Sequence, residues 1–268
     1  MILSDSIHGC DVAPKKGATI FDGEKKLFAL TINEIAAYIA DRPPRSLLSW
    51  DSPLTGPNDP DGTSLLNRDL TQRPIERFFN QKGAFKVPKG ISVLPYSGCP
   101  HWTISQRFLG LPRIGRYSST VEQLPLRPLF QQSDLESLAT ENRPFVVEVH
   151  PAVGMWLWCR KTHTRAKWRY KGDKRKRNVT VEALWSVMCI CVPKARQLPT
   201  PEDDDELDAL VAWLLADRWV AKDGVVLLGD SRLGSFLVPD VAHLQDEFES
   251  FNQKREKRLA NARKRTKK

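Results

Sequence analysis

Acidic side chains in three separated segments are the residues of this chain best suited to chemistry. Residues 200–216, TPEDDDELDALVAWLLA, form a predicted helix that carries six acids, which we call the acidic helix. Far upstream, Asp11 and Asp51 each lie near the end of a predicted strand. Carboxylates that meet in a fold repel one another unless a cation binds between them, and hard divalent cations prefer carboxylate oxygens. Together the three segments predict a divalent-metal site.

Asp208 is the member of the acidic helix that capping does not explain. We expect Thr200 to cap this helix, and Glu202 and Asp203 to complement the positive end of its dipole. Asp208 lies deeper in the helix and borders an apolar stripe that includes Leu207, where an unpaired carboxylate is costly. We therefore predict a functional role for Asp208.

The chain alternates predicted strands and helices, which is typical of an α/β fold. Strands are expected at 2–12, 18–21, 26–30, 45–50 and 145–150, with a late hairpin at 224–229 and 234–239, and helices at 35–39, 65–80, 155–159, 181–192 and 200–216. Thr31 or Asn33 is expected to cap the first helix. Residues 57–143 lose this regularity and are expected to form a long insertion after the fourth strand. A basic C-terminal helix is expected over 240–268.

Five short blocks of sequence resemble one known family. They are GCDVAP at 9–14, WDSPL at 50–54, EVHPA at 148–152, DDELDAL at 204–210 and GSFLVP at 234–239. Their order resembles that of a predicted-nuclease family catalogued as domain of unknown function four-hundred-twenty-nine, and the order of the elements resembles that of RNase H-like nucleases. The resemblance implies an RNase H-like mixed five-stranded sheet flanked by helices, within a domain that spans residues 1–239.

The resemblance also implies roles for the acids. By motif, Asp11, Asp51 and Asp208 would bind two Mg²⁺ or Mn²⁺ ions, which activate water and stabilise the leaving oxygen in phosphodiester hydrolysis. The related Holliday-junction resolvase pattern, an acid or His three residues before the Asp, selects Asp205 as a further ligand. Helical geometry instead favours Asp204, four residues before Asp208 on the same face, and the choice between the two stays open.

Other interpretations of these acids remain. Asp11 and Asp51 both stand shortly before a proline, in sequences that are also typical of turns. Glu148 lies in a predicted strand, on the face opposite Val147, where it would enter the metal site or pair with an arginine such as Arg73. We count Glu148 among the predicted catalytic residues.

Positive charge is concentrated in two short segments. The net charge of the 268 residues is +9, yet residues 160–177 alone carry +9 and residues 254–268 carry +8, so the remainder is acidic. This distribution indicates a polyanion partner. The segment 160–178 interleaves cations with aromatic rings, so we predict that its cations hold nucleic-acid phosphates and its rings stack on bases, a solvated loop being the alternative. The predicted nucleic-acid-binding residues are Arg73, Lys167, Trp168, Arg169, Tyr170, Lys174, Arg175, Lys176 and Arg177.

Cysteine usage and hydropathy point to a cytoplasmic protein. The five cysteines are scattered and lack the Cys-x-x-Cys spacing of a zinc site, which favours a reducing compartment. The apolar runs are shorter than a membrane span, and nothing near Met1 resembles a signal peptide. We therefore expect no membrane partner.

These features favour a metal-dependent nuclease that hydrolyses DNA or RNA by a two-metal-ion mechanism. The alternative is a catalytically inactive nucleic-acid-binding or complex-forming protein that keeps the RNase H-like fold. An ATP-dependent phosphotransferase fits less well, because the sequence has no phosphate-binding glycine motif.

Overall fold

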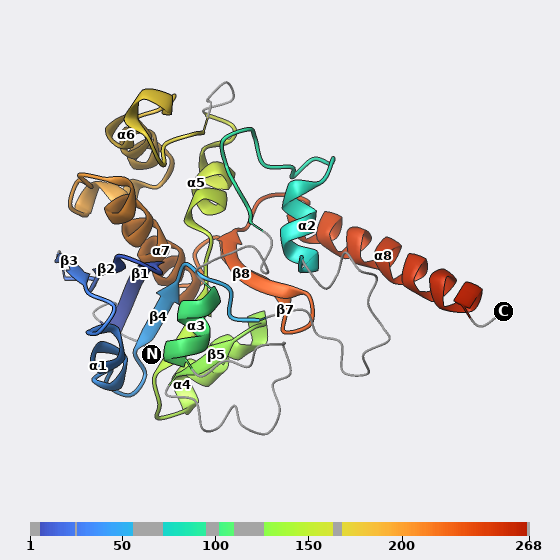
Figure 1. The fold of residues 1–268 in the computed structure, drawn as a ribbon, viewed down its shortest axis with the longest axis horizontal. Coiled ribbons are helices and arrows are strands. Elements are labelled where there is room, and N and C mark those ends of the chain that lie inside the picture. Colours follow the sequence, from blue (N-terminus) through green and yellow to red (C-terminus); the bar gives the residue numbers. More distant parts are fainter. Residues whose placement is uncertain are drawn as a thin grey trace.

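A six-stranded mixed sheet with helices on both faces organises the fold (Figure 1). The computed structural model describes residues 6–24, 26–55, 72–94, 102–109, 126–162 and 168–266. The strands are β1 (Ile7–Ala13), β2 (Gly17–Phe21), β3 (Leu27–Leu30), β4 (Leu47–Trp50), β5 (Arg127–Leu129) and β6 (Phe145–Glu148). They lie in the order β3-β2-β1-β4-β6-β5. Strand β2 is antiparallel to β1 and β3, whereas β1, β4, β6 and β5 run parallel.

Eight α-helices and a separate two-stranded hairpin accompany the sheet among the described residues. The helices are α1 (Ile35–Ala40), α2 (Pro74–Asn80), α3 (Trp102–Leu109), α4 (Ser137–Thr140), α5 (Pro151–Cys159), α6 (Val181–Cys191), α7 (Asp204–Val220) and α8 (Leu244–Thr266), and short 3₁₀ turns cover Gln132–Glu136, Lys174–Lys176 and Pro193–Gln197. The hairpin pairs β7 (Val225–Asp230) with β8 (Gly234–Pro239). A parallel bridge between Val149 and Leu237 joins this hairpin to the end of β6. None of the described helices has the length and apolar character that crossing a bilayer requires.

Strand alternation divides the interior into two cores. Ile7 of β1 belongs to the larger core, which contains most of α5 and α7. Cys10 of β1 belongs to the smaller core, together with Ile35 of α1 and Ile104 of α3. Successive side chains of a strand point to opposite faces, so Asp11 shares the face of Ile7 and points toward α7.

Helix α7 packs directly onto β1 through a glycine. A Cβ atom at Gly9 would lie 2.0 Å from the carbonyl oxygen of Ala209 and 2.6 Å from the backbone nitrogen of Trp213. The indole nitrogen of Trp213 also donates a hydrogen bond to the carbonyl of Ile7 at 3.1 Å. Every residue of α7 from Leu207 to Asp217 is buried. A helix enclosed in this way has a fixed register against the sheet, which fixes the position of Asp208.

Most expected elements are present, and the differences have local causes. The sheet has a sixth strand, β5, within the expected insertion 57–143; it is three residues long and contains a proline, which suits an edge position and hides the strand in the sequence. Residues 65–71 of the helix expected at 65–80 lie outside the described residues, and α2 covers Pro74–Asn80. A helix lies within the expected C-terminal range, as α8.

Two predicted helix caps are wrong. Neither Thr31 nor Asn33 caps α1; its N-cap is Glu34, whose carboxylate accepts hydrogen bonds from the backbone and hydroxyl of Thr31. Thr200 does not cap the acidic helix either. The cap of α7 is Asp203, whose Oδ1 accepts the backbone N–H of Glu206 at 2.9 Å. Only Asp203 caps through its side chain, because the carboxylate of Glu34 makes no cap hydrogen bond to α1.

Candidate functional site

Asp11, Asp51 and Asp208 meet at the carboxyl ends of the parallel strands. Each offers one carboxylate oxygen, and these three oxygens all lie within 4.8 Å of one another. Asp11 belongs to β1, and Asp51 follows β4 directly, with its backbone N–H donating to the carbonyl of Cys10 at 2.9 Å. Asp208 comes from α7 and directly precedes Ala209, whose carbonyl packs against Gly9. We call these three residues the acidic triad.

Burial makes the acidic triad electrostatically costly. Asp208 is 0% exposed and Asp11 is 7% exposed. Burial, reinforced by the neighbouring carboxylates, raises the pKa of Asp51 to about 7 and the pKa of Asp11 well above its usual range. Burial raises the pKa of Asp208 as well. Three buried carboxylates that repel one another are stabilised by any cation that binds between them.

Lys171 supplies a positive charge at the acidic triad. Its Nζ forms an ion pair with Oδ2 of Asp208, whose Oδ1 accepts a hydrogen bond from the hydroxyl of Tyr170 at 2.6 Å. Burial acts to lower the pKa of Lys171, but the nearby carboxylates, Asp208 foremost, raise it well above its usual range. The ammonium group is therefore charged and offsets part of the negative charge.

Sequence reasoning did not identify Lys171 as a site residue. The one signal for this segment in the sequence is the alternation of cations and aromatic rings at 167–171, which predicts that the rings stack on bases. The structure shows a different cause. Trp168 and Tyr170 are each 2% exposed, because alternate residues of this segment point into the core. The predicted stacking of these two rings on bases is wrong.

The other predicted cations of the basic segment differ in their surroundings. Arg177 pairs with Asp204 at 2.8 Å, and Arg175 lies 3.5 Å from its neighbour Asp173. Arg169, Lys174 and Lys176 are exposed, and Lys167 lies outside the described residues. The segment is thus partly neutralised by the acids at the start of α7 and partly available to an external anion.

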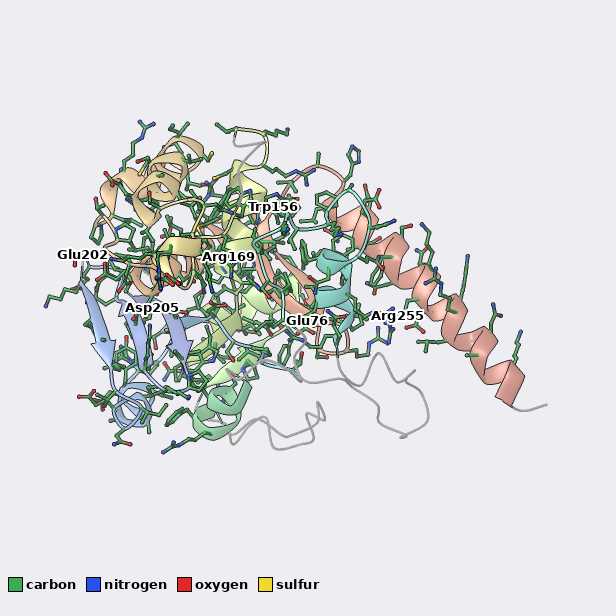
Figure 2. The ribbon with its side chains drawn as sticks, turned by 45° about the horizontal axis from the view of Figure 1, so that its top comes forward. Glu76, Trp156, Arg169, Glu202, Asp205 and Arg255 are labelled. Carbon is green, nitrogen blue, oxygen red and sulfur yellow. The ribbon has the colours of Figure 1, made fainter. Side chains whose placement is uncertain are left out.

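Asp205 and Asp204 stand outside the acidic triad. Asp205 pairs with Lys16 at 2.8 Å, and Asp204 pairs with Arg177. Figure 2 shows Asp205 at the start of α7, beside the blue strands of the sheet. Lys16 is 72% exposed, and such surface pairs contribute little free energy, so the Asp205 carboxylate can be released. Its role as a metal ligand stays a prediction.

Glu148 and Arg73 form a buried ion pair outside the acidic triad, although the charge of Glu148 acts to raise the pKa of Asp51. Arg73 donates to both carboxylate oxygens of Glu148, at 2.6 and 2.8 Å, and its Nε donates to Glu76 at 2.8 Å. The backbone N–H of Leu54 donates to Glu148 at 2.8 Å. Alternation along β6 places Glu148 on the face of Val146, opposite the face that α7 covers.

This arrangement selects the second of the two roles considered for Glu148. Its carboxylate is satisfied by Arg73, so it is not one of the triad ligands. Arg73 itself is 1% exposed and cannot reach a nucleic acid on the surface, which corrects the prediction that it binds one. A pocket of about 200 Å³ nevertheless has Asp51, Glu148, His150 and Lys171 in its wall.

Comparison with known protein families identifies the family to which the chain belongs. The model of one protein family, described as "Protein of unknown function (DUF429)", matches residues 9–232. The chain belongs to this family. The part of the chain matched to DUF429 contains the acidic triad and Lys171, whereas α8 lies beyond it. No curated protein and no solved structure matches the chain.

Proposed function

We propose that this member of DUF429 is a metal-dependent nuclease with an RNase H-like fold. The observation that carries the proposal is the convergence of three carboxylates, distant in the sequence, at the carboxyl ends of parallel strands. The order of three strands, α1, a strand followed directly by Asp51, and the acid-bearing α7 supports an RNase H-like arrangement.

The acidic triad fits a hard divalent cation such as Mg²⁺ or Mn²⁺. Its ligand atoms are carboxylate oxygens, the donors that these ions prefer, and their mutual repulsion is relieved by a bound cation. Two ions need more oxygens than a triad alone provides. Asp205 is the candidate for a further ligand, because its charge already acts on Asp11 and its pair with Lys16 is weak.

The side chains around the acidic triad would prepare a phosphodiester for hydrolysis. Divalent ions supply Lewis-acid stabilisation of charge on the phosphate oxygens. Asp11, Asp51 and Asp208 would hold these ions, and Lys171 places a further positive charge beside them. Burial lowers the pKa of His150 to about 4, so its ring is neutral near pH 7, and its buried Nδ1 has no hydrogen-bond partner among the described residues.

The direct test is cleavage of labelled DNA and RNA in Mg²⁺ or Mn²⁺. We expect Asp51→Asn and Asp208→Asn to reduce cleavage by at least about 100-fold, since each removes a metal-binding charge from a shared site. Asp223→Asn is the matched control, because Asp223 is exposed and pairs only with Arg218 among the described residues. Equal cleavage by the wild type and all three variants would remove the assignment.

Lys171 also favours a second candidate, a non-catalytic nucleic-acid-binding protein. Its ammonium group already partly neutralises the acidic triad, which a protein without bound metal would require. This candidate predicts salt-sensitive binding to nucleic acid that does not depend on divalent ions, with no turnover in their presence.

A further inference from the structure

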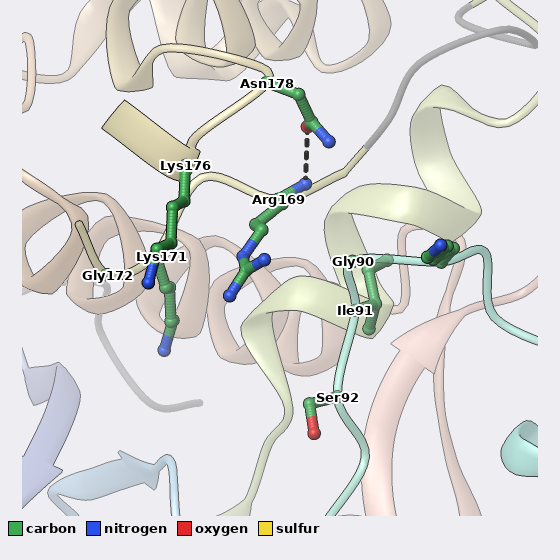
Figure 3. Close-up of a pocket in the computed structure, with 9 residues that line it drawn as sticks. Gly90, Ile91, Ser92, Arg169, Lys171, Gly172, Lys176 and Asn178 are labelled. Carbon is green, nitrogen blue, oxygen red and sulfur yellow. Dashed lines mark hydrogen bonds between the residues drawn. The ribbon is translucent and has the colours of Figure 1, made fainter. Parts of the chain in front are cut away.

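A pocket of about 840 Å³ lies next to the acidic triad (Figure 3). Among the described residues, its wall contains four cations, Lys89, Arg169, Lys171 and Lys176, and no acidic side chain. We call it the basic pocket. In Figure 3 the side chains of Arg169, Lys171 and Lys176 extend in the same direction. A cavity with this lining attracts anions and repels cations.

Within the described part of the chain, three of these cations form no ion pair with a carboxylate. They are Lys89, Arg169 and Lys176. Elsewhere the same segment does form such pairs, as Arg177 does with Asp204. The positive charge of the basic pocket is therefore available to a ligand from solution.

Backbone contacts fix the position of Arg169 in the wall of the basic pocket. Gly90 has a φ of +113°, and a Cβ there would lie 2.7 Å from the backbone nitrogen of Arg169 and 3.0 Å from the carbonyl carbon of Trp168. The two backbones are thus in direct contact, and the buried Trp168 ring anchors one of them. On the other side, Oδ1 of Asn178 accepts the backbone N–H of Arg169 at 2.9 Å. Arg169 is held in place by both contacts.

The basic pocket is continuous with the acidic site. Ser92 and Lys171 line both the basic pocket and the smaller pocket that contains Asp51 and His150. Lys171 stands at the junction, since it is also paired with Asp208. A ligand with one anionic group at the acidic triad would therefore meet positive charge at its next anionic groups.

We infer that the basic pocket binds the phosphates of a nucleic-acid strand on one side of the bond held at the acidic triad. This inference rests on the proposed nuclease function and specifies its substrate as a polymer of phosphodiesters. A polymer places successive phosphates along its length, whereas a small phosphate ester offers its charge at one point. Arg169 suits this role, because a guanidinium can donate two parallel hydrogen bonds to one phosphate.

The test measures binding without cleavage. Labelled single-stranded DNA and RNA oligonucleotides are titrated in EDTA at several salt concentrations, and binding is followed by fluorescence anisotropy. We expect the double variant Arg169→Ala/Lys176→Ala to bind roughly tenfold more weakly and to lower the log–log salt slope by about 1.4, the value for two lost single-strand phosphate contacts. Circular dichroism melting checks that the variant is folded.

The matched control removes two exposed cations outside both basic segments, as Lys26→Ala/Lys222→Ala. It should bind within about twofold of the wild type. Equal losses in both double variants would show that only net charge matters and would overturn the inference, as would wild-type affinity of the Arg169→Ala/Lys176→Ala protein. Competition by inorganic phosphate at the same concentration as the oligonucleotide would overturn the polymeric substrate class.

These outcomes are independent of catalysis. The binding experiment is repeated with Asp51→Asn, which should bind the oligonucleotide while it fails to cleave it. If no protein cleaves in Mg²⁺ or Mn²⁺ but the basic-pocket variant still loses affinity, the nuclease proposal fails and the binding site stands.

Discussion

Lys171 makes a buried group of three carboxylates compatible with folding in the absence of metal. Its ion pair with Asp208 provides the nearest positive charge at the acidic triad, and Tyr170 satisfies the other oxygen of the same carboxylate. Binding of a divalent ion at the triad would make this charge redundant. If the proposed metal ion binds, Lys171 would compete with it for the same negative charge.

We predict that Lys171→Met destabilises the metal-free protein and strengthens metal binding. Loss of the ammonium leaves buried charge uncompensated, at a cost of roughly 2 kcal/mol for a half-exposed partner. Melting in EDTA and in Mn²⁺, followed by differential scanning fluorimetry, should show a larger Mn²⁺-dependent rise in Tm for the variant. Lys16→Met is the control, with an expected cost below about 1 kcal/mol. The same Mn²⁺ response in Lys171→Met and wild type would contradict the competition.

His8 gives a pH dependence that is separate from the acidic triad. It is buried, its Nδ1 lies 2.7 Å from the hydroxyl of Tyr38, and its Nε2 lies 3.4 Å from Arg42. Burial, followed by the charge of Arg42, lowers its pKa to about 4, although Asp22 acts in the opposite direction. The unfolded chain takes up a proton near pH 6.5, whereas the folded chain does so only near pH 4. Stability from neutral His8 is thus present above pH 6.5 and is lost as pH falls toward 4.

The corresponding variant is His8→Gln. Between pH 7 and pH 4 the free energy of unfolding of the wild type should fall by about 3 kcal/mol more than that of the variant. Urea unfolding at a series of pH values measures this difference, and contributions from other groups such as His150 are common to both proteins. Parallel pH curves would show that His8 does not carry the dependence.

At the scale of elements, the acidic triad depends on how closely α7 approaches β1. Gly9 permits this approach, because any side chain there would collide with the backbone of α7. Gly154 of α5 is a useful comparison, since a Cβ there would meet the side-chain end of Leu215 at 2.9 Å. A flexible side chain can move, whereas the backbone of a fully buried helix cannot.

We predict that Gly9→Ala is far more damaging than Gly154→Ala. The first should cost more than about 4 kcal/mol or prevent folding, and the second should cost about 1–3 kcal/mol, a typical value for overpacking. Urea unfolding measures both, and Mn²⁺ titration of any folded Gly9→Ala protein reports on the triad. Similar stabilities of the two variants would show that α7 can move away from β1.

Sequence patterns predicted the elements better than the contacts between them. The expected strands at 2–12, 45–50 and 145–150, and the positions of Asp11, Asp51 and Asp208 near strand ends or on the late helix, are local features. The structure brings these three acids together. The cap of α7 was misplaced by three residues, because Thr200 and Asp203 are both good caps and tertiary packing decides between them. Local patterns give no information on which of two adequate residues the fold uses.

The failed predictions at the site concern residues whose partners are distant in sequence. The sequence predicts Arg73 both as a nucleic-acid contact and as a candidate partner of Glu148. The structure has the second, across 75 residues of sequence. The sequence predicts that the ring of Tyr170 stacks on bases. In the structure its hydroxyl donates a hydrogen bond to Asp208, which lies 38 residues later in the chain. Neighbouring residues in the sequence predict whether a cation or an aromatic ring lies at the surface or in the core. For Arg73 and Tyr170, acids that are distant in the sequence determine the position.

At the scale of the whole molecule, Arg73 connects segments that are far apart in the chain. It contacts Glu148 at the end of β6, Glu76 of α2 and the hydroxyl of Thr55 after β4. The side chain of Arg73 also packs against Gly234 at the start of β8, where a Cβ atom would lie 2.9 Å from Cδ of Arg73. The sheet, α2 and the hairpin are thus joined at one buried guanidinium.

We predict that breaking this ion pair destabilises the fold more than removing it entirely. Glu148→Gln leaves a buried guanidinium partly uncompensated and should cost about 3–5 kcal/mol, and Arg73→Met should cost a similar amount by exposing two buried carboxylates to each other. The double variant Arg73→Met/Glu148→Gln should recover part of this loss. Chemical unfolding of the three variants tests the coupling, and additive losses would contradict it.

The distribution of the acidic triad along the chain has a consequence for protein synthesis. Asp11 and Asp51 leave the ribosome early, but Asp208 follows about 150 residues later, on a helix that must still dock against the first strand. A growing chain that has not reached α7 thus holds two of the three carboxylates and no complete cation site. The complete acidic triad therefore forms only after most of the polypeptide has been made.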